Sequence, residues 1–136
     1  MNNSVYGDNY GNVGGYNNIV INIFIQGNRS FIQRTELPET TWALIILDVF
    51  NECSDLIVDQ IEQGIKQRDG VIKVDMTDVY DYCTRLLYHN GIKSDDVIED
   101  FVARFFSTLV IMNSWNFDVE IVHFRMRTFF ELTYPN

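Results

Sequence analysis

The sequence predicts an α+β domain in which an antiparallel sheet packs against three helices, in the order β-β-α-α-α-β. One stretch near each end of the chain has the pattern of strands, an N-terminal hairpin over 19–32 and a C-terminal strand over 119–128. Between them, apolar residues recur at three- and four-residue steps, which is helical spacing. The 136 residues leave room for one domain of this kind.

The first 18 residues differ in composition from the rest. Asn, Gly and Tyr occupy thirteen of these positions, with no apolar periodicity. We therefore expect a flexible arm over 1–18 and a single domain over 19–136. The glycines of the arm do not form a phosphate-binding loop, because no Lys-Ser/Thr follows them. Alternating Asn, Gly and Tyr also resemble prion-like segments, which can become ordered on self-association.

The predicted hairpin combines β-branched and aromatic residues with a turn dipeptide. Apart from Asn22, residues 19–25 are apolar, the apolar pattern resumes at Phe31, and Gly27-Asn28 between them suits a two-residue loop. In that register Phe24 faces Phe31. Apolar residues then lie on both faces of the hairpin, so we expect helices to cover one face and a second chain to have access to the other.

Three amphipathic helices are expected after the hairpin. The first covers 39–68, with Pro38 favourable for its first turn and Gly70 beyond its end. The apolar segment 71–74 is long enough only for an extended connector or a small edge strand.

The second and third helices each begin at a capping residue. Asp75 is the expected N-cap of a helix that closes at Asn90-Gly91, and Ser94 is the expected N-cap of a helix over 95–114. The third helix has the most aromatic stripe in the chain, so we expect it to be the central core helix.

Charge is the most informative part of the composition. Nineteen acidic residues against ten basic ones give a net charge of −9. Such a surface repels phosphate backbones, which disfavours direct binding of nucleic acid. The acidic residues Asp55, Asp59 and Glu62 are expected on one helical surface, where they could attract a basic protein partner. One hypothesis is that this surface and the acidic start of the third helix mimic nucleic acid, as small acidic proteins of viruses and mobile elements do.

The motifs that normally accompany catalysis or metal binding are not found. The two histidines, His89 and His123, belong to no zinc or nucleophile motif, and Cys53 and Cys83 lack close ligand spacing. We therefore expect no enzyme activity, no metal and no cofactor. The cysteines are expected to be reduced thiols, and the lack of a signal sequence or a long apolar span favours a soluble, intracellular protein.

One basic row stands out in this acidic chain. His123, Arg125 and Arg127 alternate with apolar residues along the predicted C-terminal strand, which would place them on one strand face. They could bind a phosphate, a carboxylate motif or the acidic helices of a second copy. The simpler interpretation is a solvated face with ordinary ion pairs.

These observations favour a non-enzymatic protein–protein interaction module that assembles as a homodimer or higher homo-oligomer. The supporting features are the missing reaction motifs and more apolar residues than one sheet face requires. The alternative from another class is a small ligand-binding protein or enzyme with a pocket between sheet and helices, using Tyr80, Tyr82, His123 or Arg125.

Overall fold

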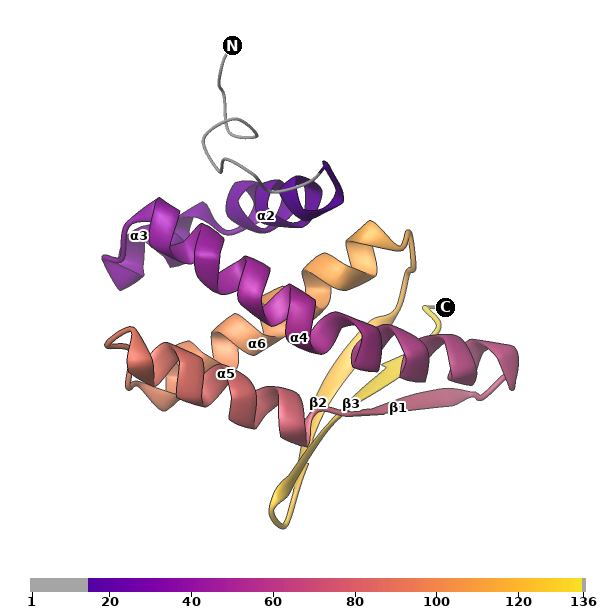
Figure 1. Ribbon diagram of the computed structural model, residues 1–136. Helices are drawn as coiled ribbons and strands as arrows, with labels where there is room; N and C mark the ends of the chain where they lie inside the picture. Colours follow the sequence, from indigo (N-terminus) through magenta and orange to yellow (C-terminus); the bar gives the residue numbers. More distant parts are fainter. Residues whose placement is uncertain (1–14, 136) are drawn as a thin grey trace.

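A computed structural model describes the backbone of residues 15–135 and the side chains of residues 18–135. The elements in this part of the chain, coloured along the sequence in Figure 1, are the helices α2 (Gly15–Gly27), α3 (Arg29–Thr35), α4 (Glu39–Lys66), α5 (Thr77–His89) and α6 (Asp95–Met112), and the strands β1 (Val71–Asp75), β2 (Asp118–Phe124) and β3 (Arg127–Thr133). The fold is α+β, but β1 lies between α4 and α5, and β2 and β3 follow α6. None of the helices described is both long enough and apolar enough to cross a lipid bilayer.

The predicted N-terminal hairpin is wrong, because residues 19–32 lie in two helices, α2 and α3. The residues of α2 that become buried are Val20, Ile21, Phe24 and Ile25, which share one helical face against α4 and α6. The β-branched residues of this segment favour a strand locally, but burial of this face on two helices outweighs that preference. Helix α2 begins inside the segment expected to be an arm. Residues 1–14 lie outside the described residues, so the arm stays a prediction.

Gly27-Asn28 separates two helices instead of closing a hairpin. The side-chain amide of Asn28 donates a hydrogen bond to the carbonyl of Phe24 (2.7 Å), and its backbone N–H donates to that of Ile25 (3.3 Å). These bonds satisfy carbonyls that the end of α2 would otherwise leave unpaired. Phe24 and Phe31 do meet, with ring centroids 6.4 Å apart, but across a helical corner.

The three strands form an antiparallel sheet in the order β1-β3-β2. Ile72, Val74, Phe130 and Leu132 on its inner face are buried against the helices. The predicted single C-terminal strand is wrong, since the chain reverses after Phe124 and returns as β3. The segment expected to be a connector or small edge strand forms β1, at one edge of the sheet.

A cluster of buried rings joins the helices. The ring centroid of Trp42 on α4 lies 5.4 Å from both Phe31 of α3 and Phe101 of α6, and Phe101 lies 5.5 Å from Phe24 of α2. All four side chains are fully buried, so each contributes a large apolar area to the core. Helix α6, which the sequence predicts to be central, packs on α2, α4 and α5.

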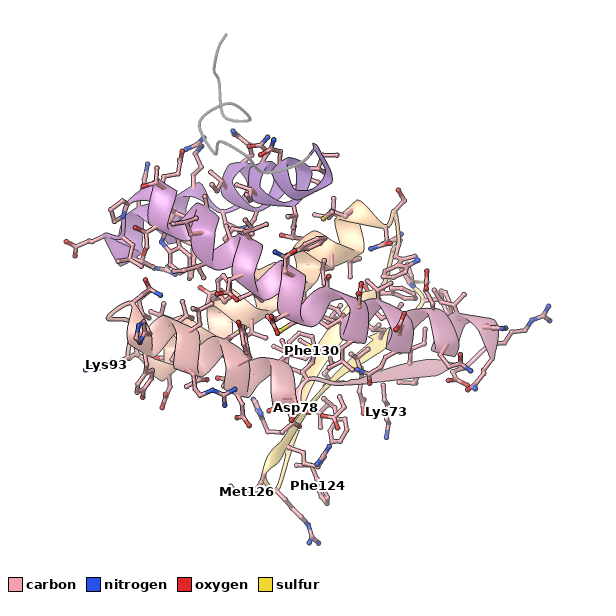
Figure 2. The ribbon with its side chains drawn as sticks, in the orientation of Figure 1. Lys73, Asp78, Lys93, Phe124, Met126 and Phe130 are labelled. Carbon is pink, nitrogen blue, oxygen red and sulfur yellow. The ribbon has the colours of Figure 1, made fainter. Side chains whose placement is uncertain are left out.

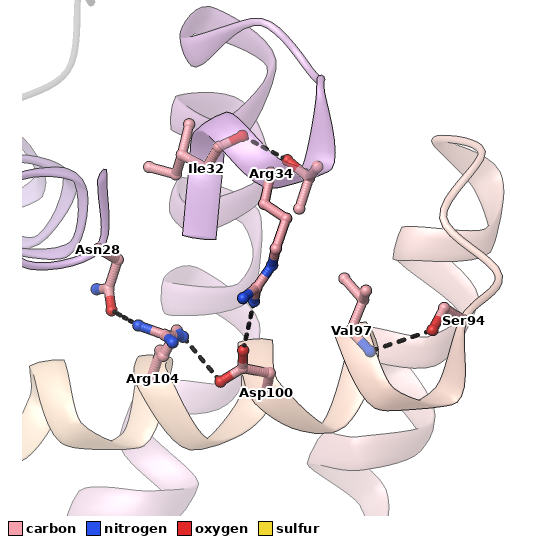
Figure 3. Close-up of polar contacts among 8 residues, drawn as sticks. Asn28, Ile32, Arg34, Ser94, Val97, Asp100 and Arg104 are labelled. Carbon is pink, nitrogen blue, oxygen red and sulfur yellow. Dashed lines mark hydrogen bonds and ion pairs between the residues drawn. The ribbon is translucent and has the colours of Figure 1, made fainter. Parts of the chain in front are cut away.

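Polar contacts join α6 to the α2–α3 corner, as Figure 3 shows. Arg104 donates hydrogen bonds to Asp100 (2.8 Å) and to the side chain of Asn28 (2.7 Å), and Arg34 reaches Asp100 from α3 (3.0 Å). At the start of α6 the Ser94 hydroxyl accepts a hydrogen bond from the N–H of Val97 (3.4 Å), which confirms the predicted N-cap.

Gly64 sets how closely α4 approaches the sheet. A Cβ atom added at Gly64 would lie 2.6 Å from Cγ2 of buried Ile72. We expect Gly64→Ala to lower the free energy of unfolding by about 1–2 kcal/mol, because the overpacking penalty exceeds the gain in helix propensity. Urea unfolding would measure this.

The matched control is Gly27→Ala, where an added Cβ meets no atom within 4 Å. It should leave stability unchanged or raise it slightly. If Gly64→Ala proved as stable as the parent, close α4–β1 packing would not constrain the fold.

Candidate interaction site

The β2–β3 hairpin turns on two residues that give no turn signal in the sequence. Phe124, the last residue of β2, pairs with Arg127, the first residue of β3, so Arg125 and Met126 form the loop. Arg125 has a φ of 59°, a left-handed conformation that glycine or asparagine usually supplies in such a loop. The hairpin therefore stores a small backbone strain at its tip.

This hairpin extends beyond the helices, as Figure 1 shows, and its tip carries apolar side chains. Met126 is 92% exposed and Phe124 is 59% exposed. Figure 2 shows both at the end of the hairpin, pointing away from the rest of the molecule. The guanidinium of Arg125 lies 5.2 Å from the centroid of the Phe124 ring, so the tip combines apolar and cationic groups.

The predicted basic row does not form one face. Because the chain turns at Arg125, His123 and Arg127 lie on different strands and on opposite faces of the sheet. His123 contacts Glu99 on α6 (Nε2–Oε2 3.4 Å) and the Thr128 hydroxyl (3.1 Å), and Arg127 forms an ion pair with Asp75. Among the described residues no carboxylate pairs with Arg125. The binding role of these three residues stays a prediction.

Asp75 anchors the hairpin close to its loop. Its carboxylate accepts a hydrogen bond from the N–H of Thr77 (3.0 Å) and pairs with Arg127 across 52 positions of sequence. Partial burial raises the pKa of Asp75, but the hydrogen bonds from Thr77 and the charge of Arg127 outweigh it and hold this pKa below its ordinary value of 3.8. The prediction that Asp75 is the N-cap of α5 is wrong by one residue, since Met76 occupies the N-cap position.

The two edges of the sheet differ. At the β1 edge, the side-chain amide of Gln60 on α4 accepts from the N–H of Asp75 (2.9 Å) and donates to its carbonyl (3.4 Å). The β2 edge has no pairing element in the part of the chain described. Strand β2 is also poorly covered by helices, since Val119 on its inner face is 43% exposed.

The predicted acidic surface lies on α4. Asp55, Asp59 and Glu62 are all exposed and follow one another at helical spacing, away from the hairpin tip. At the acidic start of α6, Asp95 and Asp96 are exposed, whereas Glu99 contacts His123 and Asp100 pairs with two arginines. The hypothesis that the two acidic rows mimic nucleic acid stays a prediction.

The side chains expected to line a pocket lie on two elements, Tyr80 and Tyr82 on α5 and the other two on the hairpin. A shallow groove of about 440 Å³ between α4 and β1 is lined by Asp59, Gln60, Gln63, Gly64, Gln67, Asp69, Ile72 and Lys73. Tyr82 lines a second groove, of about 280 Å³, with Arg85, Leu86 and His89, and its hydrogen bond to Asp48 raises the pKa of Tyr82. Tyr80 packs against the core. His123 and Arg125 lie on the hairpin.

The two cysteines are buried thiols. Burial raises the pKa of the Cys53 thiol to about 11, and burial also raises the pKa of Cys83, so both are poor nucleophiles at neutral pH. Across the described residues, no three His, Cys, Asp or Glu side chains are placed to hold a metal. Comparison of the chain with protein-family models, curated proteins and solved structures finds no match.

Replacing Asp75 by Asn tests the anchor. At pH 7 we expect Asp75→Asn to lower the free energy of unfolding by about 1 kcal/mol, since it loses the ion pair with Arg127 and weakens the bonds from Thr77. Because the folded pKa is depressed, the carboxylate stabilises the fold above pH 3.8, and this contribution is lost as pH falls through the folded value.

The difference between parent and variant should therefore shrink when urea unfolding is repeated at about pH 2–3. Asp55→Asn, an exposed carboxylate on α4, is the control and should change stability by less than about 0.5 kcal/mol. A difference that is equal at both pH values would show that Asp75 does not act through its charge.

The strain at the tip gives a separate prediction. Arg125→Gly removes the side chain that disfavours the positive φ and should raise the free energy of unfolding by about 1 kcal/mol. Met126→Gly is the matched control, because Met126 has no positive φ; it should lower stability. Thermal unfolding would measure both variants. A less stable Arg125→Gly and a more stable Met126→Gly would contradict the strain assigned to Arg125.

Proposed function

We propose that this protein is a non-enzymatic protein–protein interaction module that forms homo-oligomers. The observation that carries the proposal is the projecting β2–β3 hairpin, with Phe124 and Met126 exposed at its tip (Figure 2). Large apolar side chains gathered at one exposed place are typical of interaction sites, whereas single exposed apolar residues are common on any surface.

The surroundings of the tip also favour a protein partner. Val122 and Phe129 are half-buried neighbours on the outer face of the sheet, next to Phe124 in the strand register. The tip therefore continues into an apolar patch on the sheet. Arg125 adds a cation beside an aromatic ring, and Arg, Phe and Met are enriched in the centres of protein interfaces.

The acidic surface of α4 is a second contact region in this proposal. Asp55, Asp59 and Glu62 leave it strongly negative, which would repel other acidic proteins and attract basic ones. Self-association through the hairpin keeps the α4 surface exposed on each copy. A basic protein partner would then bind the assembled form.

Self-association is measured directly by sedimentation or light scattering. We expect the parent protein to be associated at tens of micromolar and Phe124→Ser combined with Met126→Ser to weaken association at least tenfold. Burying each of these side chains contributes about 1.5–3 kcal/mol, and about 1.4 kcal/mol corresponds to a factor of ten.

Leu44→Ser provides the matched control. Leu44 is 68% exposed on α4, so its replacement removes exposed apolar surface away from the hairpin. It should leave association unchanged. A monomeric parent protein at tens of micromolar would contradict the proposed function.

A further inference from the structure

Strand β2 has a free edge whose backbone groups can be assigned from the hairpin register. Phe124 and Arg127 flank a two-residue loop, and residues that flank such a loop form a hydrogen-bonded pair. Every second residue back from Phe124 therefore bonds to β3. The N–H and carbonyl groups of Val119, Ile121 and His123 point to the free edge.

A bond at the opposite edge of β3 supports this assignment. The N–H of Met76 donates to the carbonyl of Thr128 (2.8 Å), so Thr128 bonds toward β1. Its partner in the β2–β3 register, His123, is accordingly a residue of a non-hydrogen-bonded pair. The backbone groups of His123 then face away from β3.

From this geometry we infer that two copies of the chain pair through their β2 edges, antiparallel and with Ile121 on the two-fold axis. The inference deepens the proposed self-association and rests on it. The result would be a continuous six-stranded sheet. Three residues on each copy would exchange backbone hydrogen bonds, with Ile121 opposite Ile121 and Val119 opposite His123 of the other copy.

The charges along β2 indicate a second copy as the occupant of this edge. The strand begins with acidic Asp118 and Glu120 and ends with His123 and, in the loop, Arg125. Antiparallel self-pairing places the acidic start of one copy beside the basic end of the other. A strand without this polarity would not gain that complementarity from its own copy.

Charge also selects the register. Residues opposite each other in an antiparallel pair have their side chains on the same face of the sheet. The nearest alternative registers therefore move the two-fold axis by one residue, to Glu120 or to Val122. An axis at Glu120 places two carboxylates directly opposite each other, which is destabilising. An axis at Val122 moves Asp118 beyond the partner's strand end, to Met126. Only the axis at Ile121 places Asp118 opposite the last strand residue, Phe124, next to Arg125.

Cysteine substitution on the axis tests the register. Residues of a hydrogen-bonded antiparallel pair have Cα atoms about 5.5 Å apart, which a disulfide can span. Under mild oxidation we expect Ile121→Cys to form covalent dimers at least ten times more efficiently than Glu120→Cys or Val122→Cys. The native Cys53 and Cys83 are buried and present in all three variants, so the background is the same.

Blocking the edge gives an independent measurement. Val119→Pro removes an N–H that points to the free edge and leaves the bonds to β3 in place, a position where sheets tolerate proline. It should raise the dissociation constant for self-association at least tenfold relative to Val119→Thr, which keeps the N–H. Circular dichroism would show whether the proline variant is folded; the cysteine series decides if it is not.

The possible outcomes separate the inference from the proposed function. A parent protein that is monomeric at tens of micromolar overturns both. A dimeric parent whose Ile121→Cys variant does not cross-link preferentially overturns the inference alone, as does a folded Val119→Pro variant that associates as well as Val119→Thr. Such a dimer would assemble through another surface, or through the residues that precede α2.

Discussion

Packing on α4 is the constraint on which the rest of the structure depends. At about 1.5 Å per residue, its 28 residues span roughly 42 Å, enough to reach both the helical and the sheet part of the molecule. Near its start, Trp42 lies among the rings of α3 and α6; near its end, Gly64 lets β1 approach closely. The side chain of Gln60 on the same helix holds the end of β1 by a hydrogen bond from the backbone N–H of Asp75. The two parts share one core because α4 packs on both, and Phe106 of α6 adds a ring contact with Phe130 of β3, at 4.7 Å between centroids.

The hairpin is the part of the sheet that this packing reaches least. Strand β3 contributes buried Phe130 and Leu132 to the core, whereas β2 has no fully buried residue. Near the loop, the hairpin is held instead by polar contacts of Asp75, Thr77 and Thr128. Polar, partly exposed contacts stabilise less than buried apolar ones, so the hairpin is expected to open at a lower free energy than the core. Segments that bind partners commonly have this property.

Local sequence patterns predict the three later helices. They do not predict that residues 19–32 are helical or that the chain reverses at Arg125. The stripes of α4, α5 and α6 and the cap at Ser94 are local signals that burial reinforces. In α2 the buried set Val20, Ile21, Phe24 and Ile25 has helical spacing, but the many β-branched residues of the segment hide this pattern. The turn at Arg125 contains neither glycine nor asparagine, so nothing marked the break between two strands. The Asp75–Arg127 contact joins residues 52 positions apart, which only the folded chain brings together.

The unequal edges of the sheet bear on how large an assembly can grow. A strand that pairs at one edge normally leaves the opposite edge open for the next copy, which is how ordered fibrils elongate. Here the backbone of Asp75 at the far edge is already bonded to the Gln60 amide, and α4 flanks the groove beside it. The strand of another copy could pair there only by displacing the Gln60 amide from the backbone of Asp75. Two-fold pairing through β2 uses the same edge on both copies and so closes on itself. The side chain of a single glutamine thus favours a finite pair over an endless polymer.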